Sequence, residues 1–520
     1  MSHEASTEEL AANARVPLLA GTFVIAVCGL VYQLLAGTIS SYLLGDSVFQ
    51  FSLVIGVFMA AMGAGAFWSR HIRGNLAGAF VTIQVVLGIL GGFSAALLLF
   101  AFSALANYET ILLFVLISTG TLVGLEIPLI VRLLREEQSL RVNLSSVLSL
   151  DYAGALVAAL LFPLVLVPQL GLIRTSLLFG LLNVAVGVLA LKALHHLIPR
   201  PRAHYFYTCA AATALLISFI GAESIERFFE TRLYTGTIVH AETTPYQRIV
   251  ITADGAETNL FLNGGLQFST IDEYRYHEAL VHPAMTIAER HLKVLILGGG
   301  DGLALREVLR YGDVTSVTLV DLDPRVTELF SRNARLARLN NGAFADGRVK
   351  VINADAGKFI ENNTGIFDVI IVDLPDPRDV NLSRLYTKTF YTQLSKRLAA
   401  GGILVTQATS PFFAREAFWS IVSTLEAVPS PYQQAHTLSV VPYHTYVPTF
   451  GEWGFAAASP RTIDWARARA VVPTRYLNAQ TLAQMPAFPP DIARIEVDIN
   501  SIQTHQLTRY YELGWSRWYR

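Results

Sequence analysis

The stretch Val294–Asp323, VLILGGGDGLALREVLRYGDVTSVTLVDLD, has the pattern of a strand, a glycine-rich turn, a helix and a second strand that ends in acids. Its four leading apolar residues are typical of a buried parallel strand. The glycines of the turn, Gly298 and Gly300 among them, permit positive φ angles and close approach of a ligand. Roughly twenty residues after the turn, Asp321 and Asp323 stand where a carboxylate can bind the hydroxyls of a ribose. The stretch therefore predicts a nucleotide pocket in an α/β fold.

The turn also contains an acid, Asp301. Turns that bind a pyrophosphate offer bare backbone N–H groups at the positive end of a helix, so a carboxylate there would repel a dinucleotide and favour a cationic ligand. Asp301 could equally cap the helix that begins near Leu303. The spacing by itself leaves both roles open.

The front of the chain is far more apolar than the rest. Of all 520 residues, 52% are hydrophobic and 15% are charged, which is too apolar for an ordinary soluble protein. The surplus lies between residues 16 and 222, where apolar runs near the length of a bilayer crossing recur. We expect seven membrane spans, at about 17–43, 48–68, 76–103, 109–133, 145–168, 170–194 and 204–222.

The leader 1–15 is acidic and the first apolar run exceeds that of a secretory signal, so we predict a retained, multi-pass domain in the cell membrane. Basic residues of the short loops all fall on one side, which with seven spans places everything after residue 222 outside. An enzyme that consumes a cytosolic nucleotide should face the cytosol. We therefore expect a cytosolic soluble half, in conflict with the span count or with the orientation rule.

Two further features of composition narrow the partners. The cysteines, Cys28 and Cys209, both lie inside predicted spans, so neither a disulfide framework nor a thiolate metal site is expected. A formal net charge of −1 without a basic cluster argues against nucleic acid as a partner. The lipid bilayer is the expected macromolecular partner, and a homodimer is left open.

Acids inside the predicted spans are rare and costly, and they mark function by default. Glu126 and Asp151 are two such residues. They flank a basic loop, however, so an ion pair with Arg132 or Arg135 would explain them equally well. Structural pairing and a polar ligand path both stay open.

From about Tyr234 the sequence changes to short alternating segments. Four of them predict small antiparallel strands, with hairpin turns at Asp254-Gly255 and Asn263-Gly264. A helix over 273–289 leads into the glycine-turn strand, and strands and helices alternate thereafter. The pattern predicts a multi-span α-helical membrane domain followed by an α/β domain with a Rossmann-like, mostly parallel sheet. The expected divisions are a tail at 1–15, a helical membrane domain at 16–222, a small β domain at 223–272 and a Rossmann-like domain at 273–520.

Acids also follow the later strands. Asp355 follows the third strand, and the fourth ends in the sequence DLPDP, which contains Asp373 and Asp376. In an open α/β sheet the ligand lies outside the carboxyl ends of the strands, so these acids should meet Asp301 and Asp321 in one cleft. Because no Lys or Arg stands among them, we predict a cation-binding pocket. No spacing matches a known metal cage, so no metal is expected.

A series of motifs occurs in the order and spacing of a known family. They are Tyr246-Gln247, NGGLQFSTIDEYRYHEALVHPAM, GGGDGLALREVL, LVDLDP, NADA, VDLPDP and GGILVTQATS. Over roughly residues 234–515 the chain resembles the spermidine synthase family of aminopropyltransferases, and its front half resembles the membrane domain of some bacterial members. The resemblance implies transfer of the aminopropyl group of decarboxylated S-adenosylmethionine to putrescine, giving spermidine and 5′-methylthioadenosine. It implies a methyltransferase-type sheet with an N-terminal β domain, and no cofactor beyond the co-substrate.

Matching by motif also implies a set of residues for the nucleoside. Asp301 would hold the amine of the aminopropyl arm, where ordinary S-adenosylmethionine would bring a repelled carboxylate. Asp321 would bind the ribose, and Asp355 with Ala356 the adenine edge. Gln247 and His277 would lie near the sulfonium, and Gly298 and Gly300 would form the turn beneath it. The family commonly has Gln where His277 stands.

The resemblance implies a second set of residues for the amine. Asp373 would accept or relay the proton of the attacking nitrogen, and Tyr276 would help to orient it. Asp376 would anchor the distal ammonium, and Gln267 would line the same channel. Departures from the family are concentrated here, because Leu374 and Pro375 replace small hydroxyl residues and Phe450 replaces a tyrosine.

Two other classes of function stay in view. A methyltransferase that uses S-adenosylmethionine could have the same sheet, although Asp301 and the DLPDP acids argue against it. A non-catalytic membrane sensor or transporter of polyamines is the other alternative, and Glu126 and Asp151 encourage it.

Overall fold

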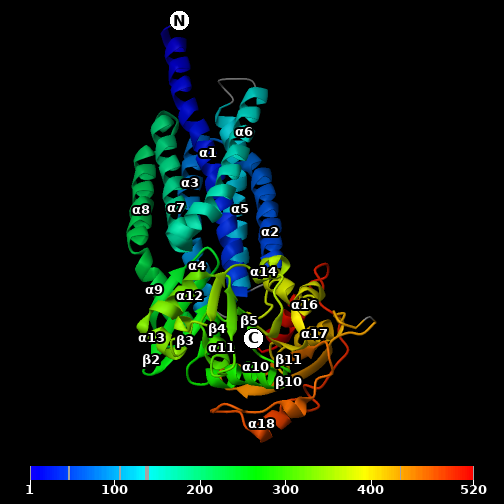
Figure 1. Ribbon diagram of the computed structural model, residues 1–520. Helices are drawn as coiled ribbons and strands as arrows, with labels where there is room; N and C mark the ends of the chain where they lie inside the picture. The colour runs from blue at the N-terminus through cyan, green and yellow to red at the C-terminus, as the bar shows by residue number, and fades with distance from the viewer. Residues whose placement is uncertain (1, 45–46, 105–106, 135–139, 434, 519–520) are drawn as a thin grey trace. The chain divides into compact units, whose positions relative to one another are not determined.

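The structure is a computed structural model that describes all residues except 1, 45–46, 105–106, 135–139, 434 and 519–520. The chain divides into two compact units, Met1–Thr235 and Gly236–Arg520, which Figure 1 colours from blue to green and from green to red. The division falls later than the predicted boundary at 222, because helix α9 (Ala222–Leu233) still packs on helices of the first unit. Each unit is described by itself below.

The first unit is entirely helical in its described part. Apolar residues cover most of each long helix, so the helices pack through a shared apolar interior. The elements are α1 (Ser2–Leu44), α2 (Ser47–Trp68), α3 (Leu76–Gly92), α4 (Ser94–Ala104), α5 (Tyr108–Leu133), α6 (Leu140–Leu161), α7 (Val167–Ala193), α8 (Pro201–Ile220) and α9.

Six described stretches of this unit are long and apolar enough to cross a membrane. One of them, Arg141–Ala193, has 53 residues, which as one straight helix would measure about 80 Å against a bilayer core of about 30 Å. Its helix is broken at Gly171, where φ is 73° and ψ is 179°. A division at Gly171 turns six stretches into the seven spans expected from the sequence, which remain a prediction.

The predicted ion pair between Glu126 and Arg132 is wrong. Arg132 donates to the carbonyl oxygens of Ser69 and Ile72 at 2.9 and 2.8 Å, whereas Glu126 is buried and accepts from Gln84 at 2.6 Å. The two side chains are six positions apart on α5, so they point in directions that differ by roughly 240° around its axis. Arg135, the other suggested partner, lies outside the described residues.

The second unit begins with the small β domain. Its strands are β1 (Thr237–Thr243), β2 (Arg248–Asp254), β3 (Glu257–Leu262) and β4 (Gly265–Ser269), paired antiparallel in chain order. Asn263 and Gly264 both have positive φ, 48° and 80°, as a two-residue hairpin between twisted strands requires. The predicted antiparallel sheet and this turn are confirmed.

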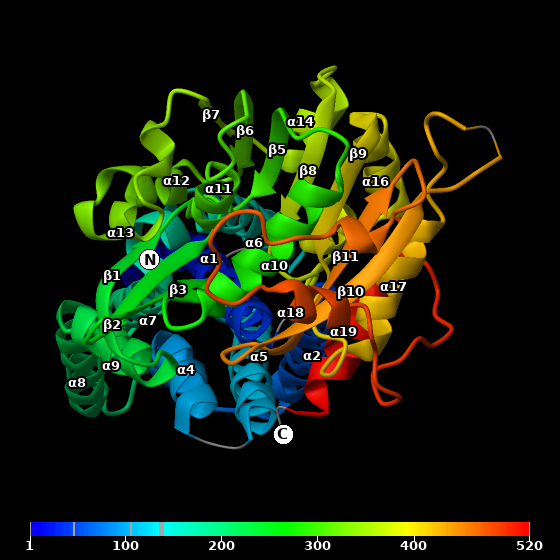
Figure 2. The ribbon, with the colours of Figure 1, turned by 60° about the horizontal axis from the view of Figure 1, so that its bottom comes forward.

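The main sheet has the order β10-β11-β9-β8-β5-β6-β7. Its strands β5 to β9 are parallel, and β10 and β11 are antiparallel additions at one edge. Figure 2 shows the strands with helices on both faces, which confirms the Rossmann-like α/β prediction. The strands are β5 (Lys293–Gly298), β6 (Ser316–Asp321), β7 (Val349–Asn353), β8 (Phe367–Asp373), β9 (Leu398–Gln407), β10 (Ser439–Val447) and β11 (Gly451–Ser459).

The helices of this unit are short, and Asn333 separates α12 from α13. Its side chain accepts from the N–H groups of Arg335 and Leu336 and so begins a new helix. The helices are α10 (Glu273–Ile287), α11 (Leu303–Val308), α12 (Pro324–Arg332), α13 (Ala334–Leu339), α14 (Ala356–Asn362), α15 (Val380–Ser383), α16 (Lys388–Ser395), α17 (Arg415–Glu426), α18 (Ala479–Gln484) and α19 (Gln506–Ser516).

Candidate active site

The glycine turn after β5 is tied to the ends of its two neighbouring strands. The N–H of Gly299 donates to the carbonyl oxygen of Asp373 at 3.1 Å, and the N–H of Gly300 donates to Asp321 Oδ2 at 3.0 Å. Gly298 has φ of 84°, and a Cβ there would lie 2.0 Å from the Asp373 carbonyl oxygen. A larger residue therefore cannot replace Gly298 without moving β8.

Four of the five acids predicted to meet, Asp301, Asp321, Asp373 and Asp376, lie at the carboxyl ends of β5, β6 and β8, and we call them the acidic cluster. Burial raises the pKa of Asp301 and Asp373. The charges of Asp373 and Asp321 raise the pKa of Asp301 further, and the charge of Asp373 also raises that of Asp321. Burial likewise raises the pKa of Asp321 and of Asp376 to about 6. Buried acids that share one site without full neutralisation favour the arrival of a cation.

Asp301 has the capping role, one of the two that its spacing left open, and its role toward a cationic ligand stays a prediction. Its Oδ1 accepts from the N–H of Leu303 at 2.9 Å, so it does cap the first turn of α11. The same carboxylate lies within electrostatic range of Asp321, Asp373 and His277. One carboxylate oxygen of Asp301 makes the cap, and the negative charge of Asp301 still acts within the acidic cluster.

Tyr276 reaches the end of β8 from helix α10. Its hydroxyl donates to Asp373 Oδ1 at 2.7 Å. The ring packs against Phe450, Trp453 and Phe455, with centroids 5.4 to 6.5 Å away. Burial and the Asp373 charge raise the pKa of Tyr276 well above its ordinary value, so the phenol stays protonated and keeps donating. Tyr276 therefore makes a polar contact with Asp373 in addition to its packing against the sheet.

Asp376 does not cap the helix that follows the DLPDP segment. That cap is made by Asp379, which accepts from the N–H of Leu382 at 3.0 Å. Asp376 instead accepts from Gln407 and Thr409, both at 3.3 Å. Its side chain therefore belongs to the acidic cluster.

Gln407 and Tyr386 hold the DLPDP segment in place. Gln407 Nε2 donates to the carbonyl oxygen of Leu374 at 2.8 Å and to the Tyr386 hydroxyl at 2.6 Å. Tyr386 in turn donates to the carbonyl oxygens of Leu374 and Pro375. Two fully buried side chains thus fix the backbone between Asp373 and Asp376.

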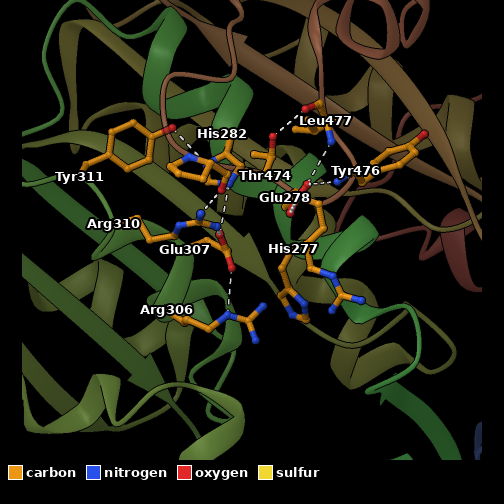
Figure 3. A network of polar contacts seen from close by, with 12 residues as sticks. His277, Glu278, His282, Arg306, Glu307, Arg310, Tyr311, Thr474, Tyr476 and Leu477 are labelled. Atoms are coloured by element: carbon orange, nitrogen blue, oxygen red, sulfur yellow. Dashed lines mark hydrogen bonds and ion pairs between the residues drawn. The ribbon is translucent and has the colours of Figure 1, made fainter.

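Basic groups lie beside the predicted acids in two places. His277 is buried, and its Nδ1 lies 2.8 Å from Glu273 Oε2, which is held by Arg306 at 2.9 Å. Burial alone would lower the pKa of His277, but the hydrogen bond and charge of Glu273 raise it to about 9. His277 is therefore a cation beside Asp301 and Asp373, and Figure 3 shows it next to Arg306.

The second basic group is Arg384, which forms an ion pair with Asp355. Asp355 also accepts from the N–H of Lys358 at 3.0 Å and caps α14, whose first residue, Ala356, is buried. Although burial opposes it, the bond to Arg384 lowers the pKa of Asp355. Asp355 therefore lies at the end of β7, and its charge is neutralised by the guanidinium of Arg384. Arg384 comes from a distant part of the sequence.

The two glutamines of the β domain differ in what they contact. Gln247 Nε2 donates to Asp323 Oδ2 at 3.1 Å, which places it at the end of β6. Gln267 Nε2 donates to the carbonyl oxygen of Gly265 at 3.0 Å, within its own strand. The guanidinium of Arg378 lies beside Gly265, so Gln267 faces the loop that follows Asp376.

The residues that sequence reasoning missed are partners of the predicted ones: Glu273, Arg306, Tyr386, Thr409 and Arg384. The spacing of Glu273 and His277, four positions apart on a helix, was a usable signal. Arg306 and Thr409 lie inside two of the quoted motifs, GGGDGLALREVL and GGILVTQATS, whereas Arg384 and Tyr386 lie outside them. Among the described residues, no group of three or more His, Cys, Asp or Glu could hold a metal ion.

The chain is similar to known proteins over most of its length. Residues 273–464 match the model of the spermine/spermidine synthase domain. The chain is 43% identical to a polyamine aminopropyltransferase of Leptospira interrogans over 505 residues, which is 96% of this chain and 99% of that one. It is 45% identical to polyamine aminopropyltransferase 2 of Ralstonia nicotianae over 96% of this chain and 98% of that one. A spermidine synthase solved with the transition-state analogue AdoDATO is 26% identical, with a TM-score of 0.44, over 49% of this chain and 86% of that one.

The fold and the acidic site define a transferase with a Rossmann-like sheet. The two relatives identify the kind of transferase, because their similarity extends over nearly the whole chain, including its front half. The chain belongs to the polyamine aminopropyltransferase family and is an aminopropyltransferase. The resemblance drawn from its motifs is confirmed.

Proposed function

We propose that this enzyme transfers the aminopropyl group of decarboxylated S-adenosylmethionine to putrescine, giving spermidine and 5′-methylthioadenosine. The observation that carries the proposal is the meeting of Asp301, Asp321, Asp373 and Asp376 at one edge of the sheet. Both substrates are cations, and a shared acidic site favours both. The family relationship supplies the aminopropyl chemistry, and the choice of putrescine is ours.

The nucleoside would be bound along the ends of β5, β6 and β7. The Asp321 carboxylate, fixed by the N–H of Gly300, accepts from the ribose hydroxyls. Asp355 and Ala356 meet the adenine edge, and Gln247 and His277 lie toward the sulfonium. The backbone at Gly298 and Gly300 allows the close approach that this position needs.

Asp301 would select the decarboxylated form of the nucleoside. Its carboxylate attracts the ammonium of the aminopropyl arm, whereas ordinary S-adenosylmethionine adds a carboxylate that Asp301 repels. In the free enzyme the positive charge of His277 balances part of the acidic cluster. When the cationic substrates bind, their positive charges neutralise the remaining negative charge of the acidic cluster.

The amine needs a lone pair before it can attack. Converting an ammonium of pKa about 10.4 to the neutral amine at pH 7 costs roughly 4 kcal/mol. Asp373 accepts this proton or passes it on, and Tyr276 holds the Asp373 carboxylate in place. The nitrogen then bonds to the carbon beside the sulfonium, the carbon–sulfur bond breaks, and its electron pair stays on sulfur in 5′-methylthioadenosine.

Asp376 would anchor the distal ammonium of the diamine. It is placed three residues beyond Asp373 and is held by Gln407 and Thr409. Gln267 lines the same channel from the β domain. A buried carboxylate facing a terminal ammonium favours a diamine over a monoamine of equal length.

A direct assay tests the proposal. Purified full-length protein is incubated with decarboxylated S-adenosylmethionine and a panel of mono-, di- and triamines, and 5′-methylthioadenosine is measured. We expect its release in equal amount with spermidine, with putrescine as the best acceptor. Methylated products from S-adenosylmethionine without 5′-methylthioadenosine would contradict the proposal in favour of a methyltransferase.

We further propose that the six apolar stretches anchor the enzyme in the cell membrane, with the catalytic unit in the cytosol where its substrates are made. A soluble protease added to oriented vesicles checks the sidedness. Cleavage of the catalytic unit from the cytosolic side alone is expected, and cleavage only from the other side would contradict it.

A further inference from the structure

A set of buried polar side chains, the polar cluster, lies inside the helical unit. It consists of Tyr32 of α1, Gln84 of α3, Glu126 of α5 and Asn183 of α7, each exposed by 3% or less. Gln84 Nε2 donates to Glu126 Oε1 at 2.6 Å, and Asn183 Nδ2 donates to the Tyr32 hydroxyl at 2.7 Å. Helix α7 contacts α1 and α3, and α5 likewise contacts α1 and α3 (Figure 1).

The two hydrogen-bonded pairs lie at the same level of the helical unit. A Cβ on Gly187, one turn from Asn183, would lie 3.3 Å from the Cβ of Gln84. A Cβ on Gly88, one turn from Gln84, would lie 3.5 Å from the Cβ of Asn183. Helices α3 and α7 therefore approach closely at both residues. Tyr32 is also within electrostatic range of Glu126, which links the pairs from the side of α1.

Three acceptor oxygens of the polar cluster are unsatisfied. Glu126 Oε2, Gln84 Oε1 and Asn183 Oδ1 are buried, and none has a hydrogen-bond partner among the described residues. Each unsatisfied buried acceptor costs about 1 to 3 kcal/mol, and the cost is larger for an ionised carboxylate. Three such oxygens on three neighbouring helices call for a ligand that brings donors and positive charge.

We propose that the polar cluster binds the primary ammonium end of an aliphatic amine. An –NH₃⁺ group has one positive charge and three N–H donors. It therefore matches three free acceptor oxygens, one of which belongs to a carboxylate. A hard metal cation would need about six oxygen ligands and fits this set less well. A single added proton would satisfy one oxygen and leave two. The inference rests on the proposed function, because amines are the substrate class of the other unit.

The amine could be the substrate or the product of the catalytic unit. A site for the substrate amine would make the helical unit a reservoir, and a site for the product would make it an acceptor that carries the product away. The chemistry of recognition is the same primary ammonium group in both cases. The two sources differ in chain length and charge, so separate binding experiments distinguish them.

The test measures amine binding to the full-length chain in detergent micelles by equilibrium dialysis, with radiolabelled putrescine in one series and radiolabelled spermidine in the other. We expect two sites per chain for at least one of these amines. Glu126→Gln and Asn183→Leu should each lose one site or weaken it at least tenfold. Thr119→Val is the control, because this buried hydroxyl of α5 bonds only to the Val115 carbonyl oxygen in the described contacts and should leave both sites intact.

Several outcomes would overturn the inference. One amine site in the unmodified chain, or two unaltered sites in both the Glu126 and the Asn183 variants, would do so. Binding of radioactive sodium at the polar cluster without any amine would also do so. Turnover is measured in parallel: a chain that turns over with a single amine site defeats this inference alone. Amine binding that depends on Glu126 in a chain without turnover defeats only the proposed function.

Discussion

The hydroxyl of Tyr276 lies 2.7 Å from Asp373 Oδ1, and it joins a helix to a strand end 97 residues further along the chain. Because burial and the carboxylate charge raise the pKa of this phenol, the hydroxyl remains a donor across the physiological pH range. One oxygen of Asp373 is thereby occupied. The other is left to face an incoming amine, which gives the proposed proton acceptor a fixed direction.

Replacing the proposed proton acceptor tests its role directly. We expect Asp373→Asn to lower kcat by roughly 10²- to 10⁴-fold, the usual range for a general base. Decarboxylated S-adenosylmethionine should still bind with nearly unchanged Kd, because its contacts lie at other residues. Steady-state kinetics and equilibrium binding measure the two effects. An unchanged kcat would remove Asp373 from proton transfer.

The orienting hydroxyl should matter less than the acceptor itself. Tyr276→Phe keeps the ring packed against Phe450 and Phe455 but removes the hydrogen bond to Asp373. We expect kcat to fall about tenfold, or roughly 1.4 kcal/mol, with the melting temperature little changed. Phe450→Leu serves as a packing control. A loss as large in the control as in Tyr276→Phe would show that packing, and not the hydroxyl, is responsible.

The selectivity of the glycine turn rests on Asp301. Asp301→Asn retains an oxygen that can accept from the N–H of Leu303 but loses the negative charge. We expect the preference for decarboxylated over ordinary S-adenosylmethionine to fall at least about tenfold, measured as the ratio of their dissociation constants. Asp321→Asn, by comparison, should weaken both nucleosides alike. An unaltered ratio in Asp301→Asn would refute the selective role.

The pH dependence of the reaction follows from the raised pKa values. Asp321 and Asp376 have pKa values of about 6, so both carboxylates become protonated as the pH falls through 6 and lose their attraction for cationic substrates. We expect kcat/KM to fall below pH 6 with a slope above one on a logarithmic plot. Asp376→Asn should lower the plateau and reduce that slope by about one proton. A profile that is flat from pH 5 to 7 would contradict the prediction.

Glu278 should be important for stability and not for chemistry. It is buried on α10 and accepts from the backbone N–H groups of Arg475, Tyr476 and Leu477 at 2.7 to 3.1 Å, as Figure 3 shows in part. Glu278→Gln replaces one carboxylate oxygen by an NH₂ group, which cannot accept a hydrogen bond from a backbone N–H. We expect a loss of about 1 to 3 kcal/mol in stability, measured by denaturant unfolding of the full-length chain.

The expected kinetic consequence of Glu278→Gln is small, because among the described residues the Glu278 carboxylate bonds to the backbone of 475–477 and not to the acidic cluster. Its kcat at a temperature where the variant is fully folded should stay within about twofold of the unmodified enzyme. An unchanged unfolding midpoint would contradict the structural role of Glu278.

The acidic site could be predicted to a large extent from local patterns. The glycine turn, Asp301, Asp321 and the DLPDP acids each follow a buried strand, and parallel strands bring their carboxyl ends to one edge. The roles assigned to these residues remain proposals. The charge of the site was predicted less well, since His277 becomes cationic only through Glu273 and Arg306.

The sequence alone determined the α/β class, the order along the chain of the motifs that follow the parallel strands, the small β domain and the apolar character of the front half. These features follow from periodicity and turn chemistry, which act over a few residues. Only the tertiary structure decided that Arg384 neutralises Asp355, that Glu126 pairs with Gln84 and not with Arg132, and that Tyr276 aims at Asp373. Such pairs join segments distant in the chain, and which side chains meet depends on helix rotation and packing, which no local pattern encodes.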